Sequence, residues 1–158
     1  METVFRRALG HMVVTVMICF VASVLYAAEP KLPEFLNSAK IVGGDLPFSE
    51  AVRFGDTLYL SGQIGVRLGT MVLAPGGVQA ETQQALENIR SILVANGRTT
   101  MDVMKCTVML ADMDEWPALN KIWRVFWTKP YPARSALGTS GLALGARVEI
   151  ECLATSGR

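Results

Sequence analysis

Residues 130–151 constrain the fold more than any other part of the chain. Two prolines at the start favour extended backbone for themselves and for the residues before them, so we expect a strand to begin near Arg134, after a helix. The glycine-rich link at 138–145 has the composition of a turn. Residues 147–155 then alternate between apolar and polar side chains, which predicts a second strand with one apolar face.

Two opposite charges lie on these neighbouring strand-like segments, Arg134 on the first and Glu149 on the second. An arginine can hold a carboxylate through two parallel hydrogen bonds, and a glutamate can position and polarise a water. Together they suit the hydrolysis of a small carboxylate-bearing molecule. The alternative interpretation is a solvated ion pair of little energetic consequence. Glu151 points to the same side as Glu149, so the pattern alone does not choose between them.

Two amphipathic helices and one apolar strand are predicted before this stretch. Residues 78–96 place apolar side chains on one helical stripe, and Gly97 follows as a stop signal. Residues 103–111 are mostly apolar, which fits a buried central strand. The second helix begins at Asp112, which has the spacing of a capping box with Glu115.

Aromatic residues recur at helical spacing in this second helix. Its apolar stripe consists of Leu119, Ile122, Trp123 and Phe126. Trp123 and Trp127 could form a ligand cage, but we prefer packing in the core, because an aromatic stripe at helical spacing normally packs inside.

The segment before the helices is mostly strands and turns. A short strand is expected around 35–37, and 51–54 with 58–61 predict a hairpin around Gly55, which takes positive φ. A turn-rich segment follows, with a weak strand at 71–73. Strands and helices that mix without strict alternation predict a single α+β domain, a mixed sheet with two helices on one face.

Residues 1–28 have the features of an export signal, since two arginines precede an uncharged, mostly apolar run at 12–28 that ends in small residues. The cleavage site is poor and the run is near the short end of what spans a bilayer, so an uncleaved membrane anchor is the alternative. We expect export to the periplasm or the cell exterior, with membrane contact only if the segment stays uncleaved. A linker at 29–45 leads to the domain at 46–158.

Removing residues 1–28 takes away two of the 15 basic residues and one of the 14 acidic residues, which leaves a net charge of zero. A neutral chain without a basic run does not fit a nucleic-acid partner. The same removal takes away His11, the only histidine. The remaining chain therefore cannot use histidine as a base, as a metal ligand or in a catalytic triad.

Cys106 and Cys152 remain after this removal, each within a predicted strand and on its apolar face. Free cysteine packs as a small hydrophobic residue, so buried thiols are the expected state. A disulfide between the two is the alternative that an oxidising compartment allows. No cysteine spacing typical of a zinc site is present.

Three short runs, in matching order, resemble the Rid family, also called YjgF or L-PSP. They are Leu60–Ile64, Pro132–Ser135 and Val148–Glu151, and the ordered set is more specific than any single run. Members are best known as enamine and imine deaminases. The resemblance implies a chorismate-mutase-like α+β fold and a homotrimer, in which three sheets form a central barrel and the sites lie between subunits.

The resemblance also implies roles for individual residues. Arg134 matches the arginine that binds the substrate carboxylate, and Glu149 matches the glutamate assigned to the hydrolytic water. Asn120 matches an asparagine near the pocket, and Ser61 would lie near the pocket wall. The alternative for Ser61 and Asn120 is that they simply bond backbone groups, as such residues commonly do.

Two positions depart from the family pattern. Phe48 stands where many members have tyrosine, so one hydroxyl hydrogen bond to the ligand is lost. Ala136 stands where the best-known members have cysteine, whose backbone N–H helps to hold the carboxylate. Ala136 still supplies that N–H, so its missing thiol weakens a redox role more than it weakens hydrolysis.

The resemblance therefore implies hydrolysis of a small carboxylate-bearing imine, such as the one formed from 2-aminoacrylate, to a 2-oxo acid and ammonia. An iminium carbon is already electrophilic, so neither a metal nor an organic cofactor is required. A non-catalytic trimer that binds small carboxylates or shields other proteins is one alternative. An endoribonuclease is the other, although the neutral charge and the missing histidine count against it.

Overall fold

The computed structural model describes residues 31–38 and 46–156. The predicted export signal or anchor at 1–28 lies outside the described residues, as does much of the linker at 29–45. None of the helices in the described part of the chain is long and apolar enough to cross a membrane.

The described residues form one seven-stranded mixed sheet with two long helices. The strands are β1 (Glu34–Leu36), β2 (Ala51–Phe54), β3 (Thr57–Leu60), β4 (Gln63–Ile64), β5 (Val103–Leu110), β6 (Ala133–Gly138) and β7 (Val148–Thr155). The helices are α2 (Gly77–Ala95) and α3 (Trp116–Phe126), with short 3-10 turns at Thr100–Asp102, Met113–Glu115 and Ala143–Gly145. The predicted α+β class is confirmed.

The strand order is β1-β2-β3-β7-β5-β6, with β4 paired to β7. Only β5 and β6 run parallel, because α3 provides the crossover between them. All the other pairs are antiparallel. The expectation that the strands of Arg134 and Glu149 are neighbours is therefore wrong, since β5 lies between β6 and β7.

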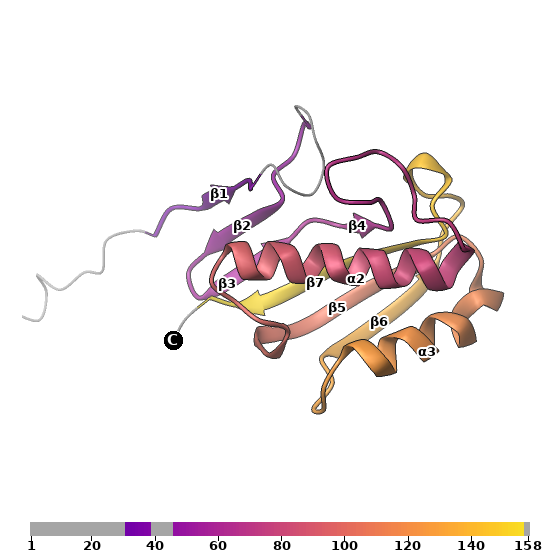
Figure 1. Ribbon diagram of the computed structural model, residues 1–158. Coiled ribbons are helices and arrows are strands. Elements are labelled where there is room, and N and C mark those ends of the chain that lie inside the picture. The colour runs from indigo at the N-terminus through magenta and orange to yellow at the C-terminus, as the bar shows by residue number, and fades with distance from the viewer. Residues whose placement is uncertain (1–30, 39–45, 157–158) are drawn as a thin grey trace, which may run out of the picture. The chain divides into compact units, whose positions relative to one another are not determined.

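Both helices cover the same face of the sheet (Figure 1). The predicted stripe of the first helix packs into the core and is buried along its whole length: Val78, Thr82, Ala85, Leu86, Ile89, Ile92 and Leu93. This helix ends as predicted at a glycine, because Gly97 adopts a φ of 68° and its N–H donates to Val94 O at 3.0 Å, while Arg98 N–H donates to Leu93 O at 2.8 Å.

No helix of the described residues covers the opposite face of the sheet, and apolar side chains lie on it. Register places Val52, Tyr59, Met109, Leu137 and Leu153 on this open face. Tyr59 and Leu137 keep close to half of their surface exposed. Within the described part of the chain, an apolar sheet surface is thus left uncovered.

The predicted hairpin is present, with Gly55 at a φ of 59° between β2 and β3. Two local expectations need correction. The segment after β3 contains β4, which the turn-rich composition hid because the strand is only two residues long. The weak strand at 71–73 reduces to one isolated bridge, between Leu73 and Val66.

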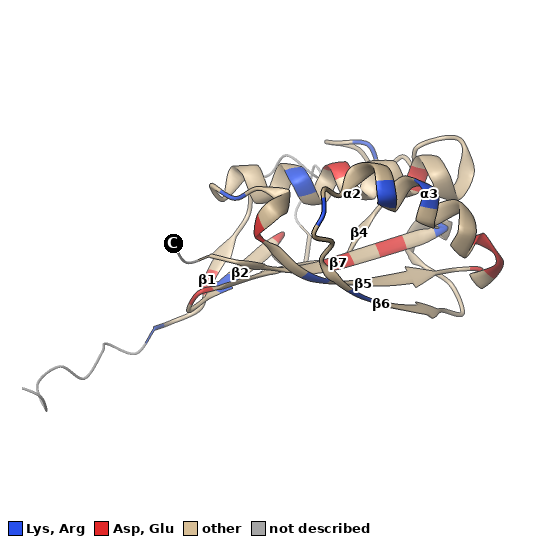
Figure 2. Ribbon diagram, turned by 90° about the horizontal axis from the view of Figure 1, so that it is seen from below, with Lys and Arg blue, Asp and Glu red and all other residues tan. Residues whose placement is uncertain are grey.

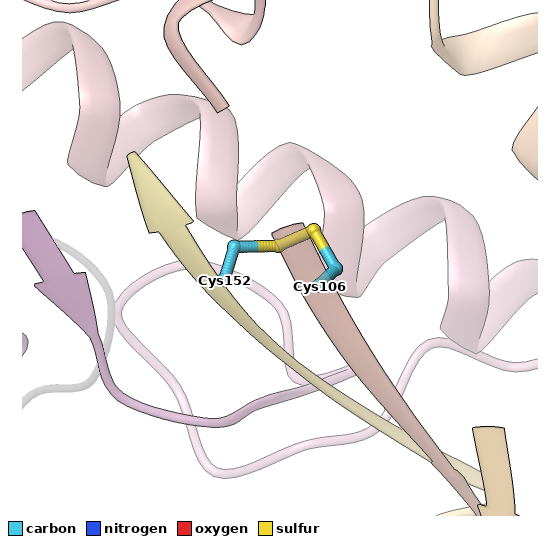
Figure 3. The surroundings of a disulfide bond; sticks show 2 residues. All are labelled: Cys106 and Cys152. Carbon is cyan, nitrogen blue, oxygen red and sulfur yellow. A yellow bond between two sulfur atoms is a disulfide. The ribbon is translucent and has the colours of Figure 1, made fainter. Parts of the chain in front are cut away.

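Cys106 and Cys152 form a disulfide (Figure 3). The expected burial is confirmed, since each residue is 1% exposed, but the expected free thiols are wrong. The reason is register: β5 and β7 are antiparallel neighbours, and the two cysteines stand directly opposite each other on the helix-covered face. The bond joins the two central strands beneath the helices.

Candidate functional site

Arg134 projects from β6 toward α3. Its guanidinium carbon lies 4.3 Å from the ring centroid of Trp116 and 4.7 Å from that of Trp123, both within cation–π range. Its Nη2 donates a hydrogen bond to Asn120 Oδ1 at 2.8 Å. The arginine is therefore held by contacts with two indole rings and one amide.

The spacing along α3 explains this arrangement. Trp116, Asn120 and Trp123 are separated by four and then three residues, so they share one face of the helix. Trp123 also packs against Trp127, with ring centroids 5.3 Å apart. The preferred packing interpretation holds for that pair, but it missed Trp116 and the cation that contacts two of the three rings.

The guanidinium keeps one unsatisfied donor. Arg134 Nη1 is shielded from water and has no hydrogen-bond partner among the described residues. Burial lowers the pKa of Arg134, and the nearby charge of Arg124 lowers it further. A buried donor without a partner is costly, so an acceptor such as a carboxylate oxygen would relieve that cost.

Glu149 lies on β7 on the open face, opposite Ile64 of β4 on one side and Met109 of β5 on the other. Its carboxylate rests against Gly62. Burial raises the pKa of Glu149, and the like charge of Glu151 raises it further. A carboxyl with a raised pKa is a better proton acceptor, which suits a general base.

Ser61 lies near Glu149, because it directly precedes Gly62, the residue that the Glu149 carboxylate contacts. Its hydroxyl donates to Ser49 O at 2.6 Å, and its N–H donates to Glu50 O at 3.0 Å. These contacts fix the segment that follows Phe48, whose side chain is 55% exposed. The backbone-bonding alternative thus describes Ser61 in a single chain, whereas Asn120 bonds a side chain, that of Arg134.

The predicted site residues fall into two groups on opposite faces of the sheet. Register puts Arg134 beside Cys106 on the helix-covered face, and Ala136 follows it on the same face. Glu149 is three residues from Cys152, whose side chain also points to the helices, so Glu149 points to the open face. One chain therefore does not bring Arg134 and Glu149 together. Because the two residues lie on opposite faces, they also do not form the solvated ion pair that was the alternative interpretation.

An ionic cluster that the pattern did not indicate fixes the start of β7. Arg147 makes an ion pair of 2.8 Å with Glu115 and one of 3.7 Å with Asp112. Its backbone N–H donates to Glu81 Oε2 at 2.7 Å, which ties the strand to α2. Glu115 therefore binds Arg147 instead of completing the predicted capping box, and only Asp112 caps, by accepting from Asp114 N at 2.9 Å.

Positive and negative residues are interspersed along the ribbons of the helices and the sheet (Figure 2). Within residues 31–38 and 46–156, no group of three or more histidine, cysteine, aspartate or glutamate side chains could hold a metal ion.

Comparison with known proteins gives consistent results. The family model described as "Endoribonuclease L-PSP" matches residues 43–156. A human protein named 2-iminobutanoate/2-iminopropanoate deaminase is 39% identical over 122 residues, which is 77% of this chain and 89% of that protein. The mouse protein of the same name is 42% identical over 111 residues, covering 70% and 82%.

Solved structures show the same fold. RidA from the Antarctic bacterium Psychrobacter has a TM-score of 0.73 at 35% identity, covering 77% of this chain and 98% of that one. The E. coli protein TdcF, crystallised with bound serine, has a TM-score of 0.72 at 28% identity, covering 78% and 99%.

Proposed function

Because the chain belongs to the Rid family, also described as L-PSP, we propose that it is an enamine/imine deaminase that hydrolyses small carboxylate-bearing imines to 2-oxo acids and ammonia. The observation that carries the proposal is the environment of Arg134. Its guanidinium is fixed by two indole rings and an amide, yet its shielded Nη1 has no hydrogen-bond partner among the described residues. A substrate carboxylate would complete that set.

In the proposed reaction, Arg134 binds the carboxylate and thereby fixes the imine carbon. Glu149 accepts a proton from a water as the water oxygen bonds to that carbon, and the C=N bond becomes a C–N bond. The proton then passes to the amine nitrogen. The remaining proton of the water, now on the hydroxyl, also passes to the nitrogen as the C–N bond breaks, so ammonia leaves and the oxygen forms the carbonyl of the 2-oxo acid. Backbone N–H groups near Ala136 would add donors for the carboxylate.

We also propose that the site is completed between subunits of a homotrimer. Two features support this assembly: the two groups of site residues lie on opposite faces of one sheet, and the open face keeps exposed apolar side chains such as Tyr59 and Leu137. A second chain that covers the open face could bring its Arg134 group to Glu149. Sedimentation equilibrium of residues 29–158 should give three chain masses, and a stable monomer at micromolar concentration would contradict the assembly.

Export remains our proposal for location. The predicted signal at 1–28 supports it, and so does the buried disulfide, because disulfides persist mainly in oxidising compartments. An exported deaminase would meet imines formed outside the cytoplasm. Cell fractionation with N-terminal sequencing tests this, and a cytoplasmic protein that begins at Met1 would contradict it.

The activity is tested with imines generated in situ by an amino-acid oxidase, by measuring ammonia and 2-oxo acid release above the uncatalysed rate. The wild type should accelerate release from at least one imine. Glu149→Gln should lose turnover while it keeps ligand binding, because the shape stays and the base is gone. Glu151→Gln is the matched control on the same face and should keep most activity.

Two outcomes would point to the other functions. A wild type that binds the imine-derived 2-oxo acid without accelerating any imine would be a binding protein. Salt-sensitive cleavage of RNA without deaminase activity would instead support the endoribonuclease that the family description names.

A further inference from the structure

The carboxylate of Glu149 lies directly against the backbone of Gly62. A Cβ placed on Gly62 would be 2.0 Å from Glu149 Oε1, 2.9 Å from its Cδ and 3.1 Å from its Cγ, and these are the three nearest atoms. The φ of Gly62 is outside the left-handed region, so the chain does not need glycine here for its conformation. It needs glycine for the space.

The backbone of Gly62 is held on both sides. Ser61 before it bonds to Glu50 O and Ser49 O, and Gln63 and Ile64 after it pair with Ile150 and Glu149 of β7. The glycine cannot easily move away, so a side chain at this position would displace the glutamate instead. The far end of the Glu149 side chain is flexible, so the fold should tolerate its displacement. The carboxylate, however, would no longer lie in its wild-type position.

We propose that Gly62 is a positioning residue for Glu149, because its missing side chain lets the carboxylate lie in the junction between β3 and β4. This inference rests on the proposed function, in which Glu149 orients the attacking water. Adding one methyl group at Gly62 must move Oε1 by about 1 Å or more, since Cβ contacts below 3.0 Å are essentially never seen. A displacement of this size is enough to misalign a reacting water.

The electrostatic environment fits the same role. Burial is the main reason that the pKa of Glu149 is raised, so moving the carboxylate outward should bring its pKa back down. Other titratable groups on this open face are Tyr59 on β3, Lys105 on β5 and Glu151 on β7. None of these groups changes in a Gly62 variant, so a shift in the pKa of Glu149 would report a change in the position of its carboxylate.

The test compares Gly62→Ala with Gly138→Ala. Gly138 is the matched control, because an added Cβ there meets the flexible side chain of Met113, whose Cγ is 3.0 Å away, at a φ also outside the left-handed region. Gly62→Ala should lower kcat on the best imine by roughly 10-fold to 100-fold with a smaller change in KM. In a carbon-13 NMR titration, the Glu149 carboxyl should titrate at lower pH than in the wild type. Gly138→Ala should change neither property.

A Gly62→Ala variant with wild-type kcat and an unshifted Glu149 titration would overturn the inference. If Gly62→Ala does not fold, Gly62→Ala/Glu149→Ala decides: recovery of the wild-type Tm supports a conflict with Glu149 alone, and continued instability overturns it. A wild type without imine hydrolysis would refute the proposed function separately, because the titration still reports whether Gly62 sets the position of Glu149.

Discussion

Arg134 and Glu149 lie on opposite faces of one sheet, on strands that β5 separates. Each has its own supporting residues: two tryptophans and Asn120 hold the arginine, and Gly62 supports the glutamate. In the proposed reaction, which uses both residues, each site would therefore take one residue from each of two chains.

Replacing Arg134 with lysine should lower kcat/KM at least about tenfold, and replacing it with alanine should lower it further. Lysine keeps the charge but lacks the planar fork that can bond a carboxylate while it stacks on two rings. A lost charge-assisted hydrogen bond typically costs about 1.5–3 kcal/mol, which sets the tenfold minimum. Steady-state kinetics measure the effect. Arg124→Lys, on an exposed position of α3, is the control and should behave as wild type.

Trp116→Leu should raise KM with little effect on kcat, whereas Trp116→Phe should restore most of the affinity. The indole of Trp116 stabilises the position of the Arg134 guanidinium through a cation–π contact of roughly 0.5–2 kcal/mol. The increase in KM should therefore be about 2-fold to 30-fold. Leucine fills similar space without a ring face. Equal KM values for the leucine and phenylalanine variants would show that only packing matters at this position.

The acidic limb of the kcat/KM profile should lie above the ordinary glutamate pKa of about 4.3. Burial and the charge of Glu151 raise the pKa of Glu149, and the reaction needs its carboxylate, so activity is lost as pH falls through that raised pKa. Glu151→Gln removes the like charge and should move the limb to lower pH. A limb that stays in place in this variant would argue against Glu149 as the base.

The raised pKa of Glu149 also affects stability, but in the opposite direction to activity: it favours the folded protein at low pH. The folded pKa of Glu149 exceeds its unfolded value, so its protonation favours the folded state at low pH, and this contribution fades as pH rises through the folded pKa. Glu149→Gln should therefore be at least as stable as wild type at neutral pH. Urea unfolding at several pH values measures this.

Removing the disulfide by Cys106→Ala/Cys152→Ala should lower the free energy of unfolding by about 2–4 kcal/mol. The two cysteines are 46 residues apart in sequence, so the bond closes a long loop in the unfolded chain. The backbone around the site should change little, because alanine fits both buried strand positions without new contacts. Urea unfolding of the variant and of the reduced wild type should agree, and an unchanged midpoint would contradict the expectation.

Local features of this chain could be predicted from its sequence, because local physics determines them. The stripe on α2 follows from 3.6-residue periodicity, and Gly97 ends the helix for a conformational reason. Strand order could not be predicted in this way, since it depends on where α3 returns the chain. That crossover placed β5 between β6 and β7, which separated Arg134 from Glu149.

The candidate site could also be predicted only where its features are local in the sequence. The resemblance identified Arg134, Asn120 and Glu149, but no local pattern indicates that Trp116 contacts the arginine or that Gly62 contacts the glutamate, because both contacts join distant segments. The disulfide likewise depends on the register between β5 and β7. Spacing could have placed Trp116 on the same helical face as Asn120 and Trp123, although it could not show that this face meets Arg134.

In the proposed trimer, Arg134 of one chain works with Glu149 of another. The most direct measurement mixes Arg134→Ala chains with Glu149→Gln chains, unfolds and reassembles them together, and assays imine hydrolysis. Each variant alone should be nearly inactive. Mixed trimers should regain activity, because about one of their three sites would contain both native residues. If the reassembled mixture forms mixed trimers, as native mass spectrometry would show, and still has no more activity than the separate variants, the claim is contradicted.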